Sequence, residues 1–182
     1  MTSAAPLAVE VDGQRFTFAG GWRVLKYDDS RFHRNQFQSF AGGSKAVDAV
    51  ALSPAGECWL IEVKDYRRNR RSKAGSVFSE VAGKVRATLA GLATARLRAN
   101  DPDERDFCQH AMCANVLRIA LHLDQPDHPS RLFKQVIDPR TAVAQLRHEL
   151  HAVDPHALCY GSGIAIARLP WRVEPAPTRE QQ

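Results

Sequence analysis

Three charged residues in the first half of the chain have the types and spacing that metal-assisted hydrolysis requires. Asp48 interrupts an apolar run, and Glu62 and Lys64 lie two positions apart in a second apolar run. Hard divalent ions such as Mg²⁺ and Mn²⁺ prefer oxygen ligands and keep several waters, so two carboxylates are an adequate protein contribution. An ammonium beside them could position a water molecule or offset charge on an attacked phosphate. These residues therefore indicate a phosphodiesterase site that depends on Mg²⁺ or Mn²⁺.

A predicted β-hairpin must place these side chains. Residues 45–52 and 57–64 are largely apolar, and the segment between them contains a proline and a glycine that favour a turn. Strand pairing can then bring Asp48 beside Glu62. Because side chains alternate along a strand, one face of the second strand carries Leu60, Glu62 and Lys64, and the other carries Trp59, Ile61 and Val63. The alternative is a hairpin at a sheet edge whose charged side chains are merely solvated.

The hairpin resembles the motif of the PD-(D/E)xK nuclease superfamily, with Asp48 as the motif aspartate and Glu62-Val63-Lys64 as the E-x-K. The similarity extends over residues 22–123 as an ordered set of elements, but only the hairpin carries motif residues. Val47 stands where the family motif has proline, at a position that varies widely in the superfamily. The resemblance implies Asp48, Glu62 and Lys64 as catalytic residues, and Asp48, Glu62 and Val63 as metal-ligand positions.

This resemblance also implies a function. We expect a metal-dependent nuclease that hydrolyses phosphodiester bonds of nucleic acid, with DNA as the expected substrate, in DNA repair, restriction-like defence or mobile-element processing. The alternative is a catalytically inactive module on the same scaffold that binds nucleic acid or a protein partner. A chain of 182 residues leaves little room for a separate recognition domain, so a homodimer or a protein partner could provide targeting.

Basic residues follow the second strand of the hairpin directly. The formal net charge of the chain is +5, which favours a polyanionic partner. The residues predicted to contact phosphates without reading bases are Arg67, Arg68, Arg70, Arg71 and Lys73. The alternative for this run is a solvated loop.

Three further residues are candidates for auxiliary roles. Asp28 and Asp29 follow a predicted strand and could supply another acidic group. Lys84 belongs to a predicted helix over residues 75–100, where it falls at the border of the apolar stripe and could lean toward the site. The alternative for Lys84 is a surface ion pair with Glu80 at i,i+4 spacing.

The segment from Arg31 to Phe40 interleaves basic and aromatic residues. Such a segment could bind an unpaired nucleic-acid strand by charge and stacking. Aromatic residues at this spacing more often fill a core, and we favour that interpretation.

Length and a 44% hydrophobic content predict one domain with a substantial core. The predicted class is α/β, a restriction-endonuclease-like mixed central sheet flanked by helices, with an N-terminal accessory hairpin around Asp12-Gly13. The strands are expected at 7–11 and 14–18 in the hairpin, and at 22–27, 45–52, 57–64 and 115–123 in the central sheet.

The remaining segments complete the predicted organisation. The domain is expected over residues 1–169, followed by a proline-rich flexible tail over residues 170–182. Within the domain, we expect a loop at 100–106, a short helix at 131–136, a helix that begins at Asp138-Pro139 and a short strand at 163–167.

Cysteine spacing and hydropathy bear on the environment of the protein. The four cysteines lack C-x-x-C spacing and the seven histidines are dispersed, which argues against a zinc site. The chain shows neither a secretory leader pattern nor an apolar run long enough to cross a bilayer. We therefore expect a cytoplasmic protein with reduced cysteines and no membrane contact.

Overall fold

A computed structural model describes residues 5–67, 75–126, 137–164 and 168–177, and shows a mixed α/β fold around a mixed central sheet. The strand order is β3-β4-β5-β6-β7. The strand β4 is antiparallel to β3 and to β5, whereas β6 is parallel to β5 and to β7. The bounds are Arg23–Lys26 for β3, Ala49–Leu52 for β4, Glu57–Asp65 for β5, Val116–Asp124 for β6 and Leu158–Gly161 for β7.

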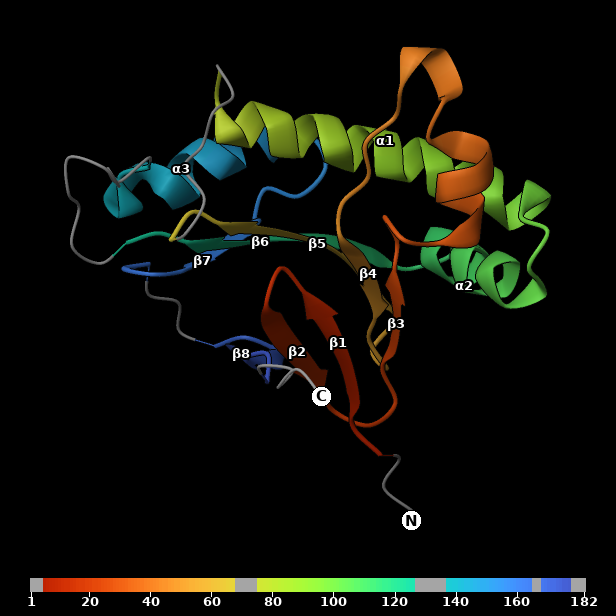
Figure 1. Ribbon diagram of the computed structural model, residues 1–182, viewed down its shortest axis with the longest axis horizontal. Helices are drawn as coiled ribbons and strands as arrows, with labels where there is room; N and C mark the ends of the chain where they lie inside the picture. Colours follow the sequence, from red (N-terminus) through yellow and green to blue (C-terminus); the bar gives the residue numbers. More distant parts are fainter. Residues whose placement is uncertain (1–4, 68–74, 127–136, 165–167, 178–182) are drawn as a thin grey trace, which may run out of the picture.

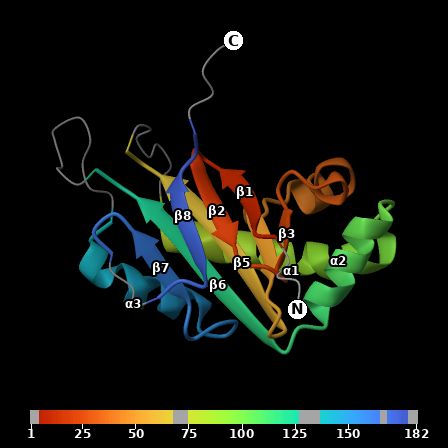
Figure 2. The ribbon, with the colours of Figure 1, turned by 90° about the horizontal axis from the view of Figure 1, so that it is seen from below.

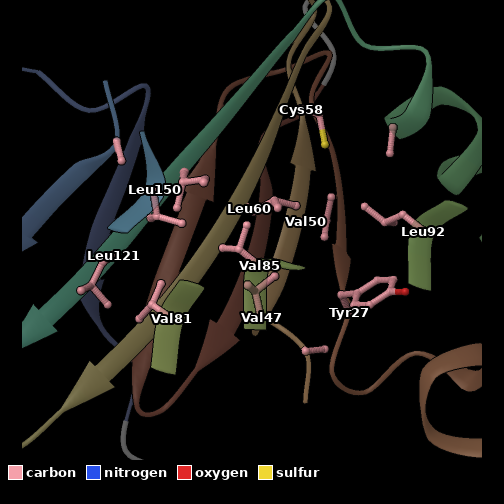
Figure 3. Packing of buried hydrophobic residues seen from close by; sticks show 14 of the residues in the cluster. Tyr27, Val47, Val50, Cys58, Leu60, Val81, Val85, Leu92, Leu121 and Leu150 are labelled. Carbon is pink, nitrogen blue, oxygen red and sulfur yellow. The ribbon is translucent and has the colours of Figure 1, made fainter. Parts of the chain in front are cut away.

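The helices α1 (Val77–Arg98) and α3 (Pro139–Leu150) lie over one face of this sheet, and α2 (Pro102–Met112) packs against α1 beside the β3 edge (Figures 1 and 2). Apolar residues from all three helices and from the sheet form one buried cluster, in which Val81 and Val85 of α1 face Leu60 of β5 (Figure 3). The predicted long helix and its inward apolar stripe are therefore confirmed, and the buried helical face fixes α1 over the middle of the sheet.

An accessory sheet lies against the other face (Figures 1 and 2). It contains the predicted hairpin, with Asp12 and Gly13 at its turn in the left-handed conformation that such two-residue turns require. A third strand then pairs with the hairpin. The strands are β1 (Leu7–Val11), β2 (Gln14–Phe18) and β8 (Trp171–Pro175), in the order β1-β2-β8.

Both faces of β5 are covered as a result. Leu60 packs among the helices, and Trp59, Ile61 and Val63 pack against the accessory sheet, which confirms the predicted alternation. The first hairpin strand is shorter than predicted, however, because it begins at Ala49 and not at residue 45. The main-chain N–H of Val47 donates to Thr88 Oγ1 of α1 at 3.0 Å, so this group pairs with the helix and not with a neighbouring strand.

The expected loop at 100–106 is wrong, because α2 begins within it. The Asp101 carboxylate accepts hydrogen bonds from the main-chain N–H groups of Asp103 and Glu104, and Pro102 occupies the first helical turn. The same Asp-Pro arrangement starts α3 at Asp138, where the sequence prediction is confirmed. Short polar segments that end one helix can therefore also cap the next.

The expectation of a flexible tail from residue 170 is wrong for residues 171–175. These residues form β8, which pairs antiparallel with β2. Trp171 is only 4% exposed and packs against Trp59 and Phe18. Trp171 and Val173 alternate with Arg172 and Glu174, which is a period-two strand pattern, and both apolar side chains pack in the cluster between the two sheets. The prolines and polar residues around this short pattern favour a loose tail instead.

Two other predictions fall partly or wholly outside the described residues. The short helix at 131–136 lies outside them, as do residues 165–167 of the strand expected at 163–167. Within the described part of that strand, Ile164 makes only an isolated bridge with Gly161.

The aromatic segment before β4 divides between core and surface. Phe32 and Phe37 are buried in the helical core, as the favoured interpretation predicts. Phe40 is 60% exposed, so it does not fill the core. No helix in the described part of the chain is both long and apolar enough to cross a bilayer.

Candidate active site

The central hairpin and α1 bring two carboxylates and two lysines together. Ala49 pairs with Ile61, so the antiparallel register places the preceding residue, Asp48, beside Glu62. Two hydrogen bonds hold Asp48 in place. Its main-chain carbonyl accepts from the Tyr27 N–H at 2.9 Å, and its side-chain Oδ2 accepts from the Val63 N–H at 2.6 Å. The carboxylate is therefore positioned by the strands on either side of it.

Glu62 receives both lysines on a single oxygen. Lys84 Nζ lies 2.6 Å from Glu62 Oε1 and 3.5 Å from Asp48 Oδ1, so one ammonium links the two carboxylates. Lys64 Nζ lies 2.8 Å from the same Oε1 and 3.1 Å from Glu80 Oε1 of α1. Lys84 therefore points into the site, and the alternative of a surface pair between Glu80 and Lys84 is wrong.

Burial determines the electrostatics of the pair. Desolvation of the Glu62 carboxylate, which is 1% exposed, raises its pKa to about 7, and repulsion by Asp48 adds to this effect, while Lys84 and Lys64 oppose it. For Lys64, burial works against the charged form, but attraction to Glu62 and Glu80 outweighs it and raises the pKa above its usual range. Lys64 is thus held as a cation next to a carboxylate that exchanges its proton near neutral pH.

This arrangement predicts that stability falls as pH rises through the pKa of Glu62. The unfolded chain releases this proton near 4.5, whereas the folded protein retains it up to about 7. The folded state therefore binds more protons between these values, and the free energy of unfolding decreases with rising pH by on the order of 3 kcal/mol. In the parent, the free energy of unfolding should be lower at pH 8 than at pH 5. In Glu62→Gln this difference should be smaller, as measured by chemical denaturation in EDTA.

A surface carboxylate provides the control for this measurement. Glu10→Gln removes the partner of Arg15 in an exposed ion pair, and it should retain the parental pH dependence. An equally steep pH dependence in Glu62→Gln and in the parent would show that Glu62 does not titrate as described.

The donor set of the site fits a hard divalent ion. Glu62 Oε2 is buried and has no hydrogen-bond partner among the described residues, so one carboxylate oxygen remains for a ligand. Within the same residues, no three His, Cys, Asp or Glu side chains come together as a group that could hold a metal ion. An ion held by Asp48 and Glu62 would therefore take its other ligands from water and phosphate oxygens, as Mg²⁺ commonly does.

Val63 contributes to the site only through its main chain. Its side chain packs on the opposite face of the sheet, against the accessory sheet. Its N–H is engaged by Asp48, as described above, so of its polar groups only the carbonyl could serve as a ligand.

The two acidic candidates after β3 lie in different surroundings. Asp28 is half-buried, its Oδ1 lacks a partner among the described residues, and burial followed by repulsion from Asp48 raises its pKa. Asp29 is exposed and pairs with Lys26 at 2.7 Å and Arg34 at 3.7 Å. The structure therefore brings Asp28 toward the site and leaves Asp29 outside it.

Sequence reasoning missed two acidic residues of the site. Glu80 holds Lys64, and the signal that could have found it is its position one helical turn before Lys84 on α1. Asp12, at the turn of the accessory hairpin, is close enough for Asp48 to contribute to a raised pKa, of which partial desolvation is the larger cause. No local pattern marks Asp12, because its position depends on how the accessory sheet packs.

Of the five basic residues predicted to bind phosphate, only Arg67 belongs to the described part of the chain. Arg67 lies 2.7 Å from Asp65 and 3.3 Å from Asp124, so it already has carboxylate partners. The other four residues, Arg68, Arg70, Arg71 and Lys73, fall outside the described residues, and their role stays a prediction.

Comparisons with known proteins give one partial likeness. No family model and no solved structure matches the chain. Among curated proteins, the chain is similar to a cysteine-tRNA ligase of Neisseria meningitidis serogroup A, with 36% identity over 112 residues. The match covers 57% of this chain and 16% of that protein, so the chain spans about one sixth of its length.

Proposed function

We propose that this protein is a metal-dependent phosphodiesterase that cleaves nucleic acid, with DNA as the expected substrate. The observation that carries the proposal is the link between Asp48 and Glu62 through the Lys84 ammonium, with Lys64 on the same Glu62 oxygen. Two buried carboxylates and two lysines at one end of a hairpin provide ligands for a hard cation and positive charge for a phosphate.

Each residue has a distinct role in this proposal. Asp48 and Glu62 would hold Mg²⁺ or Mn²⁺, which would act as a Lewis acid toward a phosphate oxygen and activate water. Lys64, fixed by Glu80, would offset the negative charge that develops on the attacked phosphate. Lys84 keeps the two carboxylates together in the metal-free protein, so a cation that takes both carboxylates competes with its ammonium.

Support for the restriction-endonuclease-like version of the fold comes from the same hairpin. Asp48 directly precedes β4, Glu62 and Lys64 lie on its antiparallel partner β5, β5 is parallel to β6, and α1 covers the site. In this proposal the PD-(D/E)xK resemblance describes the site, and the accessory sheet with Asp12 is an addition to it.

Cleavage assays test the proposal directly. Purified protein should cut DNA in the presence of Mg²⁺ or Mn²⁺ and not in EDTA. Supercoiled plasmid, single-stranded DNA and tRNA are tested as separate substrates. The tRNA arm is included because of the partial likeness to a protein named as a tRNA ligase. Failure to cut any substrate, together with calorimetry that detects no Mg²⁺ or Mn²⁺ binding, would overturn the proposal. Binding of nucleic acid without cleavage would instead support the inactive binding module.

A further inference from the structure

A groove leads along α1 to the candidate active site. It has a volume of about 570 Å³ and lies between α1 and the segment before β4, which pass each other in Figure 1. Its lining includes Phe40, Lys45, Glu80, Lys84 and Arg86. Because Lys84 lines the groove and also contacts both Glu62 and Asp48, the groove borders the candidate active site.

The charge of this groove suits a polyanion. Lys45 and Arg86 are exposed and form no ion pair with any residue in the described part of the chain. Glu80, the acidic residue of the lining, is already bonded to Lys64. The exposed charges that face a ligand are therefore positive, as required for contacts with a phosphate backbone.

The wall of the groove presents an aromatic ring to solvent. Phe40 is 60% exposed, and its ring stacks on Phe37, with centroids 5.2 Å apart and an interplanar angle of 27°. Ala41 follows in a left-handed conformation with φ of 52°, which non-glycine residues rarely adopt. The backbone thus holds an apolar ring at the surface at a conformational cost, supported from behind by the core.

A second hollow continues the path on the far side of Phe40. It has a volume of about 370 Å³, and its lining includes Phe37, Phe40, Ala90, Thr94 and Arg98. Phe37, Phe40 and Ala90 line both hollows, so they adjoin at the aromatic ring. The distance along α1 from Lys84 to Arg98 is roughly 21 Å at about 1.5 Å per residue, which is long enough for several nucleotides.

We propose that this path binds a single-stranded segment of nucleic acid and guides it to the active site, an inference that rests on the proposed nuclease function. An exposed ring can stack on a base only if that base has a free face, which the bases inside a duplex lack. Phe40 provides the stacking surface, and Lys45, Arg86 and Arg98 contact the phosphates. The preferred substrate is therefore nucleic acid with an unpaired region. Separate measurements with DNA and with RNA oligonucleotides determine which of the two is bound.

Binding measured in EDTA tests this inference without cleavage. Fluorescence anisotropy should show that Phe40→Ala weakens binding of a labelled single-stranded oligonucleotide by about tenfold and leaves binding of the matched duplex unchanged. Phe40→Trp should restore the affinity, and the added tryptophan fluorescence should be quenched by the single strand. The double variant Lys45→Ala, Arg86→Ala should weaken binding and flatten its salt dependence.

Leu97→Ala is the matched control, because Leu97 is an exposed apolar residue of α1 that lines neither hollow. It should bind as the parent does. Equal single-strand affinity in Phe40→Ala and the parent would overturn the inference, as would equal loss of duplex and single-strand binding. If the parent cleaves DNA and Phe40→Ala binds normally, only this inference fails. If binding depends on Phe40 but no metal supports cleavage, the proposed nuclease function fails and the binding path stands.

Discussion

Asp48→Asn should lower metal-dependent cleavage by at least about 100-fold while the protein remains folded. The substitution removes one of two carboxylates proposed to hold the ion. The asparagine carbonyl can still accept the Val63 N–H that Asp48 accepts at 2.6 Å, so the strands keep their hydrogen bond. Calorimetric titration with Mn²⁺ should show weaker binding, and gel assays with plasmid DNA should show the loss of cleavage.

Comparison with other substitutions separates the roles of the residues. Asp48→Ala leaves the buried Val63 N–H without its partner, so it should also destabilise the fold by about 1–3 kcal/mol. Lys64→Ala should retain Mn²⁺ affinity but lose cleavage, because the lysine acts on the phosphate and not on the ion. Parental cleavage by Lys64→Ala, or parental Mn²⁺ affinity in Asp48→Asn, would contradict the proposed roles.

Trp171→Ala should destabilise the protein by about 3–5 kcal/mol, which corresponds to a decrease in melting temperature of roughly 10 °C. Trp171 joins the accessory sheet to the central sheet: it packs edge-on against Trp59 at 5.1 Å, and its Nε1 donates to the Tyr160 hydroxyl at 3.3 Å. Removal of the indole leaves a cavity between the two sheets. It also removes the hydrogen-bond donor of the Tyr160 hydroxyl. Thermal and chemical denaturation would measure the effect.

A neighbouring substitution in the same strand controls for the backbone of β8. Arg172 is exposed, so Arg172→Ala should change stability by no more than about 0.5 kcal/mol. Trp171→Phe should fall between the parent and Trp171→Ala, because it keeps an aromatic ring but loses the donor. A melting temperature in Trp171→Ala equal to that of the parent would show that residues 171–175 do not stabilise the sheet.

Local pattern was sufficient to predict the central hairpin, the parallel strand after it and the long helix between them. Side chains of β5 alternate between two buried faces, and the apolar residues of α1 recur with the helical period, so both patterns can be recognised from consecutive residues. The same periodicities placed Glu62 and Lys64 on one face of β5 and Lys84 at the edge of the apolar stripe of α1, and the structure brings all three together.

Contacts between distant segments could not be predicted in this way. Asp12 approaches the site because the accessory hairpin packs against the sheet, and this packing leaves no periodic signal near Asp12. Glu80 lies one helical turn before Lys84, but its contact with Lys64 depends on how α1 crosses the sheet. The strand at residues 171–175 carries only two apolar residues, Trp171 and Val173, and their partners lie far away in the sequence. The helix at Pro102 differs from the prediction for another reason: its Asp-Pro start is present in the sequence, but the charged, proline-containing run around it favours a loop.

The pairing of β8 with β2 has a consequence for synthesis of the chain. Residues 14–18 leave the ribosome early, but their partner strand at residues 171–175 is added only after the entire central sheet has been made. Until then, Phe16 and Phe18, which are buried in the finished protein, lack one neighbour of their sheet. Such long-range pairing forms slowly and leaves an apolar strand edge open in the meantime. During translation, the edge of β2 is therefore open to aggregation until residues 171–175 have been added.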